Sequence, residues 1–208
     1  MDRALRRAHD RQAAAYDRRW AAYVQGSLEL LRPALAGRDA GDLLDLGCGT
    51  GALLPRLAAW ETRVGRCVGV DPSRAMLRAA LSRLAAAPTP RAGLAAAEAE
   101  RLPLRDASFD TVVSASSFHD WHDPAAGLAE ARRVLRPGGR LLLLDWSRGF
   151  RSMRLLDLWM RLTRVRYRRM YAPGELARLL EGAGFRVERR EGRKLGPAWG
   201  LVLLEAAR

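Results

Sequence analysis

The chain has 208 residues, 49% of them hydrophobic and 28% charged, which is enough for one globular domain with a buried core and too short for two domains of ordinary size. The sequence has no apolar run of membrane-spanning length, and its charged start lacks the apolar segment of a secretory signal. Two cysteines are too few for a disulfide framework, so we expect a cytoplasmic protein. The net charge of +13, carried almost entirely by arginine, favours anionic partners without identifying one.

The predicted elements alternate between strands and helices after a helical N-terminal region at 2–35, which closes at Pro33 and Gly37. Strands are predicted at 43–47, 67–70, 93–97, 109–115, 140–146, 185–191 and 198–206. Helices are predicted at 51–60, 73–86, 124–135, 150–169 and 173–182. This order predicts a three-layer α/β sandwich, a single domain over 1–208, whose mainly parallel seven-stranded sheet has an antiparallel C-terminal edge strand.

The segment DLGCGTG (45–51) lies between a predicted strand and a predicted helix. Glycine lets the backbone turn sharply and approach a ligand, and the helix that follows offers free N–H groups at its start. Gly47, Gly49 and Ala52 also satisfy the loop pattern of dinucleotide-binding proteins, so a nicotinamide-dependent oxidoreductase stays open at this point. A tight turn without any ligand is the structural alternative.

Acidic residues follow the next two predicted strands. Asp71 ends the second strand, where a carboxylate can accept hydrogen bonds from both hydroxyls of a ribose. Its alternative role is to cap the helix that starts near Ser73. Glu98 and Glu100 follow the third strand, where an acidic side chain can accept a hydrogen bond from an adenine amino group.

Five motifs in order resemble those of class I S-adenosylmethionine (SAM)-dependent methyltransferases of the small-molecule, methyltransferase type 11-like kind. They are DLGCGTG, GVDPSRAML, AEAERLP, FDTVVSASSFHD and RVLRPGGRLLLLD, over about residues 43–146, and YAPGELARLLEGAGFRV (171–187) resembles the usual tail. The resemblance implies a Rossmann-like fold, SAM as the cofactor and S-adenosylhomocysteine as the product. An oxidoreductase would leave the fourth and fifth motifs unexplained.

The same resemblance assigns ten positions to the cofactor. They are Asp45, Gly47, Gly49 and Gly51 for the methionine part, Asp71 for the ribose, Pro72, Met76, Glu98 and Ala99 for the adenine, and Ser114 for the sulfonium and amino group. Glu98 stands where the family usually has aspartate, so Glu100 competes with it for the adenine contact. Cys48 is interpreted as a small packed residue of the loop.

Methyl transfer is an in-line displacement that depends mainly on alignment, so a base is needed only where the acceptor must lose a proton. His119, after the fourth predicted strand, is the candidate catalytic residue, because histidine can accept a proton or orient a hydroxyl near neutral pH. Local hydrogen bonding is its alternative role. His122 is close by, but a single short loop is insufficient for a metal site, and none is predicted. Asp123 is expected to cap the helix that begins at Pro124.

Two segments are expected to form the acceptor pocket: residues 1–40 as a helical lid, and residues 148–172 as a helical insertion. The candidate pocket residues are Tyr16, Trp20, Trp121, Arg168, Arg169 and Tyr171. In the insertion one helical face carries Arg154, Asp157, Arg161, Arg164 and Arg168, and another carries Leu155, Leu158, Trp159, Leu162 and Val165. The arginine face is interpreted as a site for a phosphate or carboxylate of the acceptor, as a contact with an anionic membrane, or as the solvated side of a core-packing helix.

The sequence therefore predicts an enzyme that transfers a methyl group from SAM to a small anionic or lipophilic acceptor. RNA methylation is disfavoured, because no RNA-binding module is appended and no N-P-P-Y-type motif follows the fourth strand. A protein that binds SAM without turnover stays open, because the glycine loop and Asp71 report cofactor binding and not catalysis.

Overall fold

The computed structural model describes residues 3–86, 92–163 and 169–208, with side chains from residue 16 onward. One seven-stranded sheet has the strand order β3-β2-β1-β4-β5-β7-β6. Its strands are β1 (Asp39–Leu46), β2 (Arg63–Val70), β3 (Ala92–Ala95), β4 (Phe109–Ala115), β5 (Leu135–Trp146), β6 (Arg186–Leu195) and β7 (Trp199–Ala207). The first five are parallel, and β7 is antiparallel to both β5 and the edge strand β6. The predicted mainly parallel α/β sheet is confirmed, with its antiparallel strand one place inside the edge.

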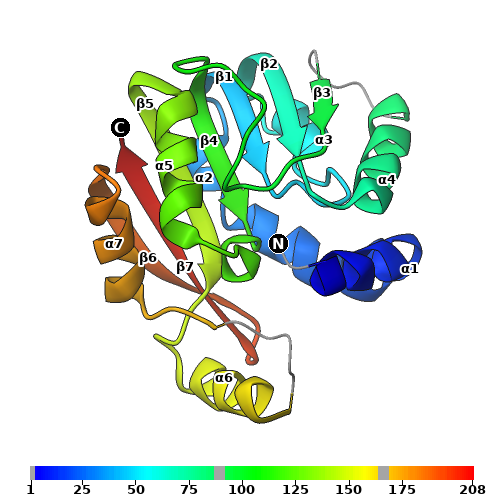
Figure 1. Ribbon diagram of the computed structural model, residues 1–208, viewed down its shortest axis with the longest axis vertical. Coiled ribbons are helices and arrows are strands. Elements are labelled where there is room, and N and C mark those ends of the chain that lie inside the picture. Colours follow the sequence, from blue (N-terminus) through cyan, green and yellow to red (C-terminus); the bar gives the residue numbers. More distant parts are fainter. Residues whose placement is uncertain (1–2, 87–91, 164–168) are drawn as a thin grey trace.

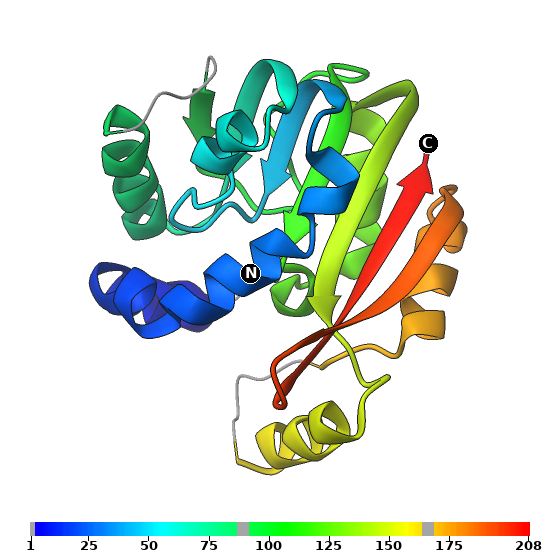
Figure 2. The ribbon, with the colours of Figure 1, turned by 180° about the vertical axis from the view of Figure 1, so that it is seen from behind.

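Helices cover both faces of this sheet (Figures 1 and 2). They are α1 (Arg3–Glu29), α2 (Arg32–Leu35), α3 (Leu54–Ala59), α4 (Arg74–Ala85), the short 3₁₀ helix η1 (Phe118–Asp120), α5 (Pro124–Val134), α6 (Arg151–Thr163) and α7 (Pro173–Gly182). No helix in the described ranges is long and apolar enough to cross a membrane.

The core lies in two layers because successive strand residues point to opposite faces. Leu141 and Leu143 of β5 pack with α5 and α7, whereas Leu142 and Leu144 pack with α1, α2 and α3. All four leucines are fully buried. This explains why the β5 sequence is apolar along its length instead of alternating.

Two predicted helices have different bounds in the structure. The predicted helix over 2–35 is interrupted at Leu30 and Leu31, and Pro33 lies in the first turn of α2 instead of closing the region. Proline suits a first helical turn because its missing N–H would have no partner there. The helix predicted from 51 begins at Leu54, because Gly51 has a φ of +70° that an α-helix does not accommodate.

The loop between β3 and β4 is fixed to α5 by Arg133. Its guanidinium donates to the carbonyls of Leu102 and Leu104, at 3.2 and 2.8 Å, and to the carboxylate of Glu130. Glu130 in turn accepts a hydrogen bond from the Leu102 N–H at 2.7 Å. The segment that carries Glu98 is therefore held in place from α5.

We expect Arg133→Met to lower the free energy of unfolding by about 1–3 kcal/mol, because two carbonyls and the carboxylates of Glu130 and Asp106 lose their donor. Urea denaturation measures the change. Arg105→Met removes an exposed arginine of the same loop with no described side-chain hydrogen bond and should change stability by less than about 0.5 kcal/mol. Equal losses in the two variants would contradict this role for Arg133.

Candidate active site

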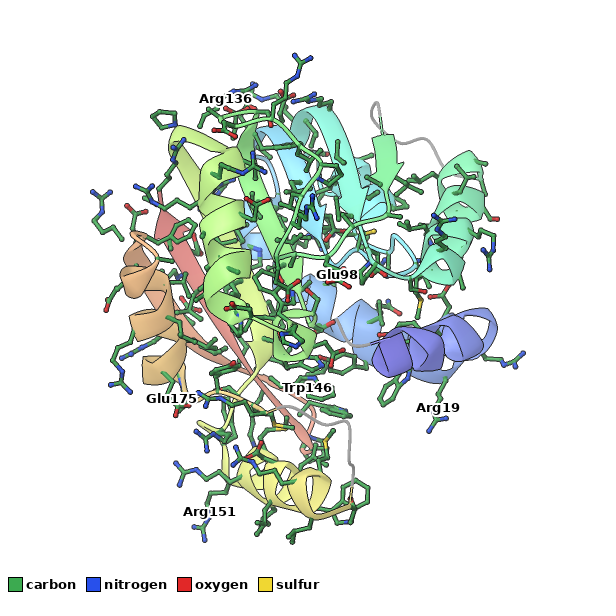
Figure 3. All side chains as sticks on the ribbon, viewed as in Figure 1. Arg19, Glu98, Arg136, Trp146, Arg151 and Glu175 are labelled. Carbon is green, nitrogen blue, oxygen red and sulfur yellow. The ribbon has the colours of Figure 1, made fainter. Side chains whose placement is uncertain are left out.

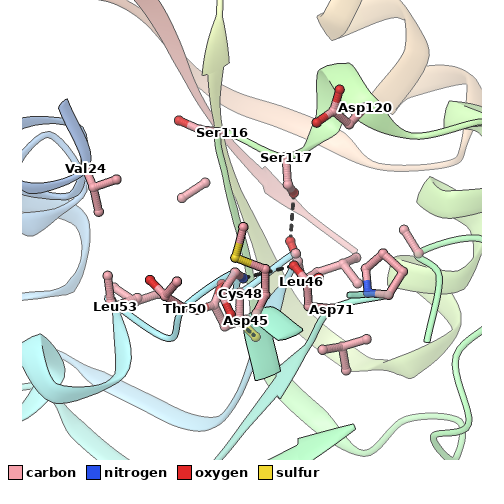
Figure 4. Close-up of a pocket in the computed structure, with 18 of the residues that line it drawn as sticks. Val24, Asp45, Leu46, Cys48, Thr50, Leu53, Asp71, Ser116, Ser117 and Asp120 are labelled. Atoms are coloured by element: carbon pink, nitrogen blue, oxygen red, sulfur yellow. Dashed lines mark hydrogen bonds between the residues drawn. The ribbon is translucent and has the colours of Figure 1, made fainter. Parts of the chain in front are cut away.

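A cavity opens at the carboxyl ends of β1, β2 and β4 (Figure 4). The chain leaves β1 toward β2 on one side and reaches β4 on the other, and ligands of open α/β sheets bind at such a switch point. The lining comes from α1, the loop after β1, the start of the loop after β2, the segment 97–100 and the segment 115–121.

Gly47 and Gly49 give the loop after β1 two different surroundings. The N–H groups of Gly47 and Cys48 both donate to the carbonyl of Val70, at 2.8 and 3.0 Å. Gly47 has a φ of +81°, and a Cβ there would collide with the Ser117 side chain. Gly49 has a φ of +53° but faces open space, with no atom within 4 Å of where its Cβ would lie. The loop is tight where it meets β4 and open where it meets the cavity.

Asp71 connects this loop to the end of β2. One carboxylate oxygen accepts from the Gly49 N–H at 3.0 Å, and the other accepts from the Ser73 N–H at 2.8 Å. The helix cap that the sequence offered as an alternative role belongs to Ser73, whose hydroxyl accepts from the Met76 N–H at 3.1 Å. Asp71 lines the cavity with its carboxylate fixed in orientation.

Asp45 is a buried carboxylate that lines the same cavity. Its side chain accepts no hydrogen bond from the described residues, and it is only 2% exposed. Burial, with a further contribution from the charge of Asp71, raises the pKa of Asp45 to about 7. A cationic group in the cavity would therefore be favoured next to Asp45.

Glu98, Ala99 and Glu100 all line the cavity on the side of the loop after β3. Glu100 is engaged elsewhere, because one of its oxygens accepts from the N–H groups of His122 and Asp123, at 2.5 and 3.1 Å. Glu100 thus fixes the start of α5. Pro72 and Met76, which the resemblance assigns to the adenine, also line the cavity.

Ser114 is fully buried and does not line the cavity. Its hydroxyl lies 2.9 Å from that of Ser117, which donates to the carbonyl of Leu46 at 2.9 Å. Ser116 and Ser117 line the cavity instead. The run Ser-Ala-Ser-Ser does not reveal which serine faces a ligand, because the strand ends within it.

Helix α1 is attached to the glycine loop by a group of polar contacts that sequence analysis missed. The Thr50 hydroxyl donates to Asp17 at 2.7 Å, and Asp17 also pairs with Arg83 of α4. Arg83 donates to the Thr50 carbonyl at 3.0 Å. These three residues, which we call the latch, are 33 or more positions apart, and no local motif connects them.

An aromatic cluster continues from the cavity toward the β6–β7 hairpin. The Tyr23 hydroxyl, in the cavity wall, lies 2.7 Å from the Ser116 hydroxyl and accepts from the Trp146 indole at 2.6 Å. Trp146 stacks on Trp199 with ring centroids 5.4 Å apart, and Trp20 meets Trp199 edge-on at 6.1 Å. Trp20 belongs to this cluster and does not line the cavity, whereas Tyr16 does.

His119 lies behind the cavity wall, stacked on Trp146 at 4.2 Å. Its Nδ1 is 2.7 Å from one oxygen of Asp145, and its backbone N–H donates to the other at 3.0 Å. Its Nε2 is 3.8 Å from Asp120, which does line the cavity. Burial lowers the pKa of His119, but the charges of Asp145 and Asp120 outweigh that effect and raise it to about 9. The imidazole is therefore charged at neutral pH.

The remaining acceptor-pocket candidates fall in different places. Trp121 lines the cavity and packs on Phe118 at 4.8 Å. Tyr171 is buried and packs edge-on against Phe118, with ring centroids 5.4 Å apart, and the Arg169 guanidinium lies 4.4 Å from the Tyr171 ring. Neither Tyr171 nor Arg169 lines the cavity. Arg168 lies outside the described residues.

The comparisons agree with this architecture. A family model for a methyltransferase domain matches residues 44–143. A malonyl-[acyl-carrier protein] O-methyltransferase of Geobacter sulfurreducens is 36% identical over 193 residues, which cover 88% of this chain and 70% of that protein. A ubiquinone/menaquinone biosynthesis C-methyltransferase of Syntrophotalea carbinolica is 40% identical over 131 residues, or 63% of this chain and 52% of that protein.

A solved structure shares the fold over nearly the whole chain. It comes from a complex of the Trm112 methyltransferase activator of Haloferax volcanii with a methyltransferase, and it superposes with a TM-score of 0.79 at 20% identity, covering 96% of both chains. The first curated relatives are longer proteins, of whose length this chain spans 33% to 49%.

The pKa of His119 predicts how stability depends on pH. Because it is raised from 6.5 in the unfolded chain to about 9, the stabilisation by Asp145 is complete below pH 6.5 and lost as pH rises through 9. His119→Gln should remove this part of the pH dependence. Denaturation of both proteins at pH 6, 7.5 and 9 tests it: their difference in stability should shrink with pH, and a constant difference would contradict the charged pair.

Proposed function

Because the chain belongs to the class I SAM-dependent methyltransferases, we propose that it binds SAM in this cavity and transfers the methyl group to a small, largely apolar acceptor. The observation that carries the proposal is the Asp45 carboxylate, which is buried, faces the cavity and has no hydrogen-bond partner in the described parts of the chain. SAM brings an ammonium and a sulfonium, the cationic groups that such a carboxylate favours.

The other lining residues fit the remaining parts of SAM. The open face of Gly49 leaves room for the methionine part beside Asp45, and Asp71 is oriented to accept from the ribose hydroxyls. Glu98 lines the cavity at the position that the resemblance assigns to the adenine amino group, and Glu100 lies beside it with one oxygen held by backbone N–H groups. When bound, SAM supplies a methyl group on a cationic sulfur, already activated for displacement.

The latch supports a further role for α1, the exclusion of water. Asp17 and Thr50 connect α1 to the glycine loop, and Arg83 connects both to α4. With the latch formed, α1 closes one side of the cavity, so a bound acceptor would meet the methyl group in a restricted orientation. We therefore keep, as part of the proposal, the lid role that the sequence predicts for residues 1–40.

The lining favours an uncharged acceptor over an anionic one. Five carboxylates face the cavity, and its described lining contains no arginine, lysine or histidine. The wall toward α1 is apolar, with Val24, Leu28 and Leu53 beside the Tyr23 ring. Of the two named relatives, the quinone-biosynthesis enzyme is therefore the better guide, because a malonyl group carries a carboxylate that this wall does not neutralise.

Asp120 is the lining carboxylate best placed to handle a proton on the acceptor. It lies near Tyr16, whose pKa burial raises to about 12 with the help of the Asp120 charge. His119, fixed by Asp145, faces Asp120 from behind the wall. We therefore assign proton acceptance or hydroxyl orientation to Asp120, and to His119 the positioning of that carboxylate.

Binding of SAM should require the Asp45 charge. We expect Asp45→Asn to weaken SAM about 10- to 100-fold, the loss of a hydrogen bond to a charged group. Because the pKa of Asp45 is about 7, SAM binding at pH 7 should release up to about 0.5 proton from the wild-type protein and none from this residue in the variant. Calorimetric titrations in buffers of different ionisation enthalpy measure both effects, and the difference between the two proteins cancels the titration of the ligand itself.

Glu181→Gln is the matched control, since it removes an exposed carboxylate of α7 outside the cavity lining. It should leave SAM affinity unchanged. A wild-type protein that fails to bind SAM, or an Asp45→Asn variant that binds it equally well, would overturn the proposed function.

Catalysis should depend on Asp120 more than SAM binding does. With quinol and phenol model acceptors, we expect Asp120→Asn to lower kcat about 100-fold with little change in the Kd for SAM. His119→Gln should lower kcat less and shift its pH profile, because the positioning charge is lost. Methylated product is followed by mass spectrometry. An Asp120→Asn variant with wild-type kcat would rule out this assignment.

A further inference from the structure

Helix α6 has its apolar face on the outside of the protein. Leu155, Leu158, Trp159 and Leu162 lie on one face, at the spacing i, i+3, i+4 and i+7, and are 71%, 55%, 51% and 77% exposed. The opposite face carries Met153 and Asp157, which are buried. The alternative in which α6 packs its apolar face on the core is therefore wrong. We call the four exposed residues the α6 stripe.

The charges around the α6 stripe are positive. Arg151 is exposed at the start of the helix and projects from it (Figure 3), and Arg154 and Arg161 follow the flank of the stripe. Asp157 is the one acidic residue of α6, and it is buried and paired with Arg161 at 2.9 Å. The outward side of α6 is thus a row of large apolar groups bordered by arginines.

We propose that the α6 stripe docks on the surface of an anionic phospholipid bilayer. An interfacial helix of this kind buries its apolar face at the boundary of headgroups and acyl chains while arginines reach the lipid phosphates. Charge decides between this occupant and a second copy of the chain, because two copies with a net charge of +13 each would bring their arginines together. Since α6 lies beyond the carboxyl edge of the sheet (Figure 1), docking would turn that edge toward the bilayer.

The contacts of α6 with the rest of the protein suit an anchored helix that keeps its stripe free of the core. Met153 is fully buried, and one Asp157 oxygen accepts from the Met170 N–H at 3.1 Å. Arg154 donates to the carbonyl of Arg148 at 2.9 Å. These contacts fix the rotation of the helix, so the stripe faces outward as one surface.

Vesicle flotation with the full chain tests the proposal. We expect binding to vesicles of phosphatidylcholine that contain about one third phosphatidylglycerol. Binding to pure phosphatidylcholine should be at least about 10-fold weaker, because several arginines lose their anionic partners. Leu155→Gln/Leu158→Gln should lower the partition coefficient on anionic vesicles by about 10-fold or more. Arg151→Gln should lower it about five-fold.

Leu81→Gln is the matched control, because Leu81 is also 63% exposed but lies on α4. It should bind vesicles like the wild-type protein. No binding to anionic vesicles, or an equal loss in the Leu81 and α6 variants, would overturn the proposal. A dimer in sedimentation velocity that dissociates in the Leu155→Gln/Leu158→Gln variant would do the same, by making a second copy the occupant. These measurements do not involve SAM, so a failure of this proposal can be distinguished from a failure of the proposed function.

Discussion

The carbonyl of Val70 accepts hydrogen bonds from two successive N–H groups, those of Gly47 and Cys48, and so joins the ends of β1 and β2. This requires the chain to turn sharply after β1, which the positive φ of Gly47 permits. The turn sets Asp45 and Asp71 at the same edge of the sheet, and Asp71 then fixes Gly49 through its own hydrogen bond. Two carboxylates placed together in a buried site repel each other, and the site is therefore prepared for a cation before any ligand arrives.

Placing two carboxylates together in a buried site lowers the stability of the folded protein, and the pKa values show over which pH range. The pKa of Asp45 is raised to about 7, so the unfolded chain loses this proton near pH 4 and the folded protein keeps it until about pH 7. Stability therefore falls across that interval. His119, with a pKa of about 9, contributes a second decline from pH 6.5 upward. A cationic ligand beside Asp45 offsets only the first of these declines and leaves the decline at His119 unchanged.

Much of this arrangement is local in the sequence, and those parts were predictable. The glycine loop and Asp71 each stand within a few residues of the strand that positions them, and the mainly parallel sheet follows from the alternation of strands and helices. Contacts between distant segments were not predictable in the same way. Asp145, which raises the pKa of His119, lies 26 residues away on β5, and Thr50 is 33 residues from Asp17. Only the folded chain shows that these pairs exist.

Helix α6 marks a different limit of sequence reasoning. Its periodicity predicted an apolar face and an arginine-bearing face, of which Arg164, Val165 and Arg168 lie outside the described residues, but periodicity does not say which face meets the protein. The burial of Met153 and Asp157 decides it. Asp157 can lie on the inner face because its carboxylate pairs with Arg161 and accepts a hydrogen bond from the Met170 N–H. With Asp157 on the inner face, the leucines on the opposite face of the helix point outward. Four of the five exposed large hydrophobic side chains in the described part of the chain therefore lie on α6, beyond the edge of the sheet at which the cavity opens, and a lipophilic acceptor held in a bilayer would approach from that side.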